Sequence, residues 1–109
     1  MAAIDLHPHD LEKVVGILAR HIPDREVCVI GSRLTGHAKP FSDLDLVIMG
    51  HEPLSLRARG ELRDAFDDSS LPFTVDLVEW ATASEAFRRV IAEQARVLRP
   101  ATVAAATAG

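Results

Sequence analysis

Apolar positions recur along the chain with two periods, and these periods distinguish expected helices from expected strands. The helical period runs through three segments: residues 8–22, residues 54–67, and a last segment that begins at 82–85 and continues through Leu98. Short apolar or alternating runs predict three strands: 26–30, 42–49, and one within 71–80. This order predicts an α/β domain, in which a small mixed sheet of about three strands carries helices packed on it.

Individual residues indicate where these helices begin and which of their side chains face inward. Pro8 suits a first helical position, and Asp10 complements the helix dipole there. The sequence Thr82-Ala83-Ser84-Glu85 has the spacing of a capping box and would open the last helix. In the second helix, three apolar side chains are expected to face inward: Leu56, Leu62 and Phe66.

Length and composition limit the classes of protein to consider. The chain has 109 residues, 48% of them hydrophobic and 26% charged, which fits one globular domain. We place that domain at 1–99 and expect a disordered tail of small residues at 100–109. The formal net charge of -4 does not favour direct nucleic-acid binding. Neither a membrane-spanning stretch nor a secretory pattern is visible, so we expect a cytoplasmic protein without a membrane partner.

Three aspartates interrupt segments that otherwise belong in a core. Asp43 and Asp45 stand one residue apart at the head of the second strand, so their side chains share one face. Asp76 interrupts the apolar run of the third strand. Carboxylate oxygens are the ligands that Mg²⁺ prefers, and carboxylates on neighbouring strands suit a two-metal site for phosphoryl-type displacement. An Asp-x-Asp pair alone is more often a solvated strand end than a metal site.

A glycine and a serine follow the first strand. Gly31 permits close approach of the backbone to a phosphate, and the Ser32 hydroxyl can hold phosphate oxygens. A Gly-Ser turn alone is a weak signal. It becomes a strong one when ten residues separate Gly31-Ser32 from Asp43-x-Asp45 and a third aspartate lies on a later strand.

The stretch GSRLTGHAKPFSDLDLVI resembles the Gly-Ser-x10-Asp-x-Asp signature of the nucleotidyltransferases of the DNA polymerase β superfamily, in particular their minimal prokaryotic members. The resemblance implies the polymerase β-like fold and transfer of AMP from ATP with release of pyrophosphate. It implies that Asp43, Asp45 and Asp76 bind two Mg²⁺ ions and that Asp76 helps to deprotonate the acceptor hydroxyl. Gly31, Ser32 and Arg33 would hold the nucleotide, although Arg33 is at least as easily read as a plain loop arginine.

The minimal family also resembles the antitoxin half of HEPN/MNT toxin–antitoxin pairs, which implies that a tyrosine of a HEPN toxin accepts the AMP. The chain contains no tyrosine, so tyrosine self-modification is excluded. Two alternatives stay open at this point. The protein could neutralise its toxin by binding alone, or it could be a nucleotidyltransferase for a small molecule, which would lack a substrate domain in so short a chain.

Overall fold

The computed structural model describes residues 4–31, 33 and 43–101. The elements follow one another in this order: α1 (Pro8–His21), β1 (Val27–Ile30), β2 (Leu44–Ile48), α3 (Leu56–Asp67), β3 (Val75–Glu79), the 3-10 helix η1 (Trp80–Thr82), α4 (Glu85–Gln94) and β4 (Arg96–Arg99). The described residues form a four-stranded sheet with the order β3-β2-β1-β4. β1 runs antiparallel to β2 and β4, whereas β2 and β3 are parallel. The predicted α/β class with a mixed sheet is confirmed.

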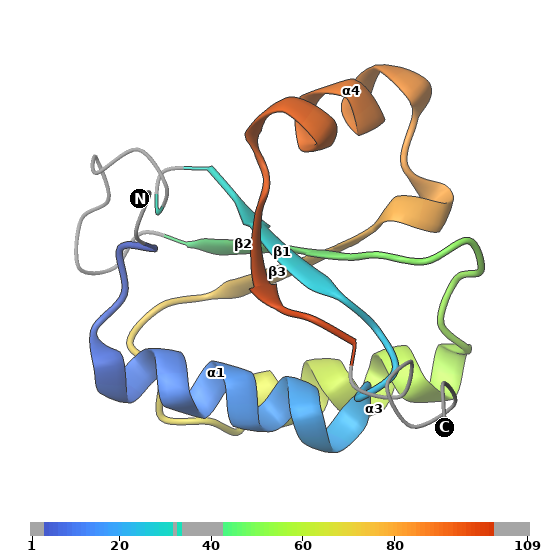
Figure 1. The fold of residues 1–109 in the computed structure, drawn as a ribbon. Helices are drawn as coiled ribbons and strands as arrows, with labels where there is room; N and C mark the ends of the chain where they lie inside the picture. Colours follow the sequence, from blue (N-terminus) through green and yellow to red (C-terminus); the bar gives the residue numbers. More distant parts are fainter. Residues whose placement is uncertain (1–3, 32, 34–42, 102–109) are drawn as a thin grey trace, which may run out of the picture.

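Two apolar clusters cover the two faces of the sheet. The larger cluster joins α1 and α3 to one face, where Leu44, Leu46 and Ile48 of β2 are almost completely buried. The smaller cluster lies on the other face, where Val47 and Cys28 pack with Ile91 of α4. Figure 1 shows this arrangement, with α1 and α3 below the sheet and α4 above it. The alternation along β2 therefore decides which side chains meet α1 and α3 and leaves Asp45 on the opposite face.

The first helix begins as its sequence predicts. Pro8 occupies the first helical turn and Asp10 lies within it. Proline costs nothing there because its missing N–H would have no intrahelical acceptor. The His7 side chain accepts a hydrogen bond from the His9 backbone N–H and caps this end.

The last part of the chain differs from the sequence prediction. The helix ends at Gln94, and Arg96–Arg99 form β4 beside β1, so Leu98 lies on a strand. Leu98 lies seven residues after Ile91, and this spacing is also the one expected for two side chains on the same face of a continuous helix. Pairing with the buried strand β1 determined the conformation instead. The predicted capping box is also wrong in register, since Ser84, not Thr82, accepts the hydrogen bond from the Phe87 backbone N–H.

One residue of α3 is also placed differently. Leu62 and Phe66 are buried as expected, but the side chain of Leu56 is 90% exposed. Leu56 is the first residue of α3, directly after its N-cap Ser55. Residues 102–109 of the expected tail lie outside the described residues, so the boundary after residue 99 stays a prediction. None of the helices in the described parts of the chain is long and apolar enough to cross a membrane.

Candidate functional site

The candidate site lies where β1 ends and where β2 and β3 begin. β2 and β3 are in a parallel register that sets Asp45 directly opposite Asp76. The antiparallel register of β1 and β2 sets Ile30, the last residue of β1, opposite Asp45. Gly31 therefore follows β1 at the same edge of the sheet. In Figure 1, β1 ends and β2 and β3 begin on the left. The sheet thus brings together three of the predicted site residues: Gly31, Asp45 and Asp76.

Gly31 lies against the Asp45 carboxylate in a backbone conformation that suits glycine. Its φ is +91°, in the left-handed region that other residues rarely adopt. A Cβ atom at this position would lie 2.7 Å from Oδ2 of Asp45, which is closer than van der Waals contact. Only glycine lets the chain turn here while the carboxylate keeps its place.

The Asp45 carboxylate has a perturbed pKa, which indicates an unusual electrostatic environment at this edge. Burial raises its pKa, and the charge of Asp76, a hydrogen bond with Asp76 and the charge of Asp43 raise it further. The Asp45 carboxyl group therefore retains its proton more readily than an isolated aspartate does. A cation between Asp45 and Asp76 would offset the charge of Asp76.

Asp43 has a looser relation to this pair. It precedes β2 and its side chain is exposed to solvent, but its charge reaches Asp45. Among the described residues, no three His, Cys, Asp or Glu side chains are arranged as a group that could hold a metal ion. The Asp45–Asp76 pair is consequently the preformed part of the site, and Asp43 lies at its rim.

The two remaining predicted residues are less directly placed. Ser32 lies outside the described residues. Arg33 is buried, with 6% of its surface exposed, and its guanidinium lies 4.7 Å from the centre of the Phe73 ring. Its Nη1 donates a hydrogen bond to the Asp5 backbone carbonyl oxygen at 3.1 Å. Phe73 and Asp5 could not be predicted as partners of Arg33, because nothing local in the sequence marks contacts 40 and 28 residues away.

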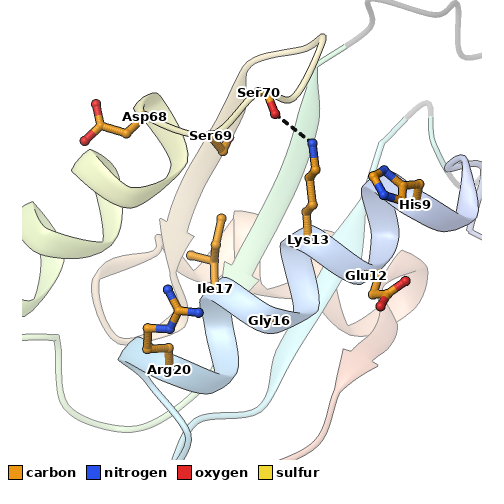
Figure 2. A pocket seen from close by; sticks show the side chains of 9 residues that line it. All are labelled: His9, Glu12, Lys13, Gly16, Ile17, Arg20, Asp68, Ser69 and Ser70. Atoms are coloured by element: carbon orange, nitrogen blue, oxygen red, sulfur yellow. Dashed lines mark hydrogen bonds between the residues drawn. The ribbon is translucent and has the colours of Figure 1, made fainter.

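A separate pocket lies between α1 and the segment after α3, with a volume of about 490 Å³. Figure 2 shows Lys13 extending from α1 across it to Ser70, where Nζ donates a hydrogen bond to Oγ at 2.7 Å. The lining residues include neither the aspartates nor Gly31, so this pocket is distinct from the aspartate site: His9, Glu12, Lys13, Gly16, Ile17, Arg20, Asp68, Ser69 and Ser70.

The only thiol in the chain is an unsuitable nucleophile. Cys28 is buried in β1. Burial and the neighbouring Glu26 carboxylate raise the pKa of its thiol to about 11. The thiolate, which is the reactive form, is therefore scarce at neutral pH.

Comparison with known proteins identifies the family. A sequence model of the nucleotidyltransferase domain matches residues 11–99, which is most of the chain and includes Gly31 and all three aspartates. The chain belongs to the nucleotidyltransferase domain family. The resemblance of the Gly-Ser-x10-Asp-x-Asp segment is thereby confirmed.

A curated relative and solved structures agree with this membership. A protein of Haemophilus influenzae named a probable protein adenylyltransferase, MntA, is 48% identical over 90 residues, which are 83% of this nucleotidyltransferase chain and 79% of the relative. A toxin–antitoxin structure with AMP-PNP matches with a TM-score of 0.69 and 26% identity, over 85% of this chain and 75% of that one. A tri-AMPylated HEPN toxin of Shewanella oneidensis in complex with an MNT antitoxin gives a TM-score of 0.62 at 24% identity, over 84% and 71%. The polymerase β-like fold is confirmed.

Proposed function

We propose that this chain is a Mg²⁺-dependent protein adenylyltransferase that transfers AMP from ATP to a tyrosine hydroxyl of a HEPN-type toxin and so acts as its antitoxin. The observation that carries the proposal is the arrangement of Gly31, Asp45 and Asp76 at one edge of the sheet. It is supported by the 48% identical relative named a probable protein adenylyltransferase and by the likeness to a toxin–antitoxin structure with AMP-PNP.

The residues at this edge fit Mg²⁺. The ion prefers hard oxygen ligands and is usually held by one or two carboxylates together with substrate phosphates. Asp45 and Asp76 supply two carboxylates in register. Burial and the neighbouring charge of Asp76 raise the pKa of Asp45, and a cation would offset that charge. Asp43 would complete the ligand set by turning its exposed side chain toward the pair. Bound Mg²⁺ supplies charge neutralisation for the triphosphate and the leaving pyrophosphate.

The chain's own groups would perform the remaining tasks. Gly31 and Ser32 would hold the β- and γ-phosphates, because glycine allows the backbone to approach a phosphate closely and a serine hydroxyl can bind its oxygens. Asp76 would accept the proton of the acceptor hydroxyl while the oxygen of that hydroxyl attacks the α-phosphorus. The bond between the α-phosphorus and the bridging oxygen to the β-phosphate breaks, pyrophosphate leaves, and AMP stays on the acceptor oxygen. Most of the rate enhancement would come from positioning and charge stabilisation.

We expect the acceptor to belong to another molecule. The chain contains no tyrosine that it could modify itself. A docked protein would present its tyrosine at a high effective concentration near Asp76, which explains how a small enzyme gains selectivity. The expected cytoplasmic location forms part of this proposal, since ATP is the substrate.

The test is incubation with α-labelled ATP, Mg²⁺ and a candidate HEPN-type partner, sought first among the adjacent genes, followed by mass spectrometry of both chains. We expect one or more AMP units on a tyrosine of the partner and none on this chain. Asp45→Ala should abolish the transfer, whereas the matched control Asp64→Ala, on the exposed face of α3, should retain it. Near wild-type transfer by Asp45→Ala would refute the proposed site.

A further inference from the structure

Arg33 is one of three buried charged residues among the described residues. Placing a guanidinium away from water is costly unless its donors and its faces find partners. The partners that Arg33 contacts therefore indicate what the side chain does. The partners described below all belong to this chain.

The first partner is the segment that precedes α1. The Asp5 backbone N–H donates to the carbonyl oxygen of Arg33 at 2.6 Å, and Nη1 of Arg33 donates to the Asp5 carbonyl oxygen at 3.1 Å. The side chain and the backbone of Arg33 thus bind the same residue from two directions. The neighbouring side chains of Ile4 and Leu6 pack against the larger core cluster, which anchors this segment.

The second partner is the segment that leads into β3. The guanidinium of Arg33 lies over the ring of Phe73 at 4.7 Å, and Phe73 itself packs against the core. The next residue, Thr74, accepts a hydrogen bond from the Leu44 backbone N–H at 2.9 Å, at the point where β2 begins. Arg33 is therefore connected through Phe73 to the starts of both strands that carry the aspartates.

We propose that Arg33 is a positioning residue, which fixes the turn at Gly31 against the strands of Asp45 and Asp76, rather than a ligand of the triphosphate. The proposal rests on the proposed function for its consequence in catalysis. A planar fork that donates to Asp5 while it stacks on Phe73 requires arginine, because a lysine ammonium offers the charge without the planar face. The arrangement holds the phosphate-binding turn in place before the nucleotide arrives.

The test compares Arg33→Lys, Phe73→Leu and the double variant with the wild type, in kcat and in KM for ATP. If Arg33 acts through Phe73, each single variant lowers kcat on the order of tenfold or more, because small displacements of reacting groups are costly. The double variant then loses no more activity than the more impaired of the two single variants, since both changes break the same contact. Wild-type kcat in Phe73→Leu would overturn the proposal, as would an Arg33→Lys variant changed only in its KM for ATP.

A second readout needs no catalysis. In the nucleotide-free protein, both single variants should accelerate hydrogen exchange at the backbone amide of Asp5, which donates to Arg33. Unchanged exchange in both variants would contradict the positioning role. If the Asp5 amide responds but the wild type transfers no AMP, the proposed function fails and the positioning role stands. Should Arg33→Lys not fold, Phe73→Leu decides the question alone.

Arg99→Lys is the matched control. Arg99 is also buried, and its Nη1 donates to the backbone carbonyl oxygens of Pro23 and Arg25 at 3.2 and 3.5 Å. It pairs with Val27, at the end of β1 opposite to Gly31. Arg99→Lys should therefore lower the melting temperature without changing kcat or the exchange of the Asp5 amide.

Discussion

Replacing Gly31 with alanine tests the close contact between the turn and the Asp45 carboxylate. Placing a residue other than glycine in the left-handed region costs about 1–2 kcal/mol, and Gly31 has a φ of +91°. The new Cβ would lie 2.7 Å from Oδ2 of Asp45, so the carboxylate must rotate away. An off-rotamer side chain adds about 1 kcal/mol. The sum of about 2–3 kcal/mol corresponds to a fall in melting temperature of roughly 10–20 °C for a domain of this size.

Gly50→Ala separates this local effect from general destabilisation. Gly50 also has a positive φ, of +131°, and a Cβ there would meet the guanidinium of Arg25, which is the far end of a flexible side chain. We therefore expect a similar loss of stability in both variants by scanning calorimetry. Transfer of labelled AMP, measured well below both melting temperatures, should fall strongly in Gly31→Ala and stay near wild type in Gly50→Ala.

Two results would refute this reasoning. Equal transfer in Gly31→Ala and Gly50→Ala would mean that the displaced Asp45 carboxylate does not matter to the reaction. Wild-type stability of Gly31→Ala would mean that the turn relaxes without moving Asp45.

Three further predictions concern individual residues. The raised pKa of Asp45 means that the folded protein binds more protons than the unfolded chain above pH 3.8, so its stability falls as the pH rises toward the raised pKa. Asp45→Asn should therefore raise the melting temperature of the metal-free protein at neutral pH, and an unchanged value would contradict the cost of burying this carboxylate beside Asp76. Asp76→Asn should retain most of the calorimetrically measured affinity for a non-hydrolysable ATP analogue but lower transfer by orders of magnitude, and equal losses would argue against a role in proton transfer. Gly60→Ala should stabilise the protein by about 1 kcal/mol in urea denaturation, because its Cβ meets no atom within 4 Å on the α3 helix; a loss of stability would show a contact that the structure lacks.

The parts of the fold that depend on local rules could be predicted from the sequence. Pro8 and Asp10 indicated the start of α1, and the period of two in β2 indicated which side chains face the core. The joint spacing of Gly31, Asp45 and Asp76 indicated one site, and the sheet register does bring these three residues together.

The parts that depend on distant contacts could not be predicted in this way. β4 is an outer strand of the sheet with four residues, and its conformation follows from pairing with β1 about 70 residues earlier. The contacts of Arg33 with Asp5 and Phe73 likewise join segments that are far apart in the sequence. From the sequence, an arginine after a Gly-Ser pair is equally compatible with a phosphate ligand and a loop residue, and the positioning role proposed above rests on its burial and contacts.

The most direct test of the central claim is whether neutralisation of the toxin needs AMP transfer. Cells that produce the HEPN-type partner would be supplied with either the wild-type protein or Asp43→Ala, and the mass of the recovered partner would be measured together with cell survival. Asp43 is exposed, so its replacement should leave folding and binding of the partner intact. We expect AMP on the partner and survival with the wild type, and an unmodified partner with cell death with Asp43→Ala. Full protection by Asp43→Ala with an unmodified partner would show that binding alone neutralises the toxin, and it would contradict the account.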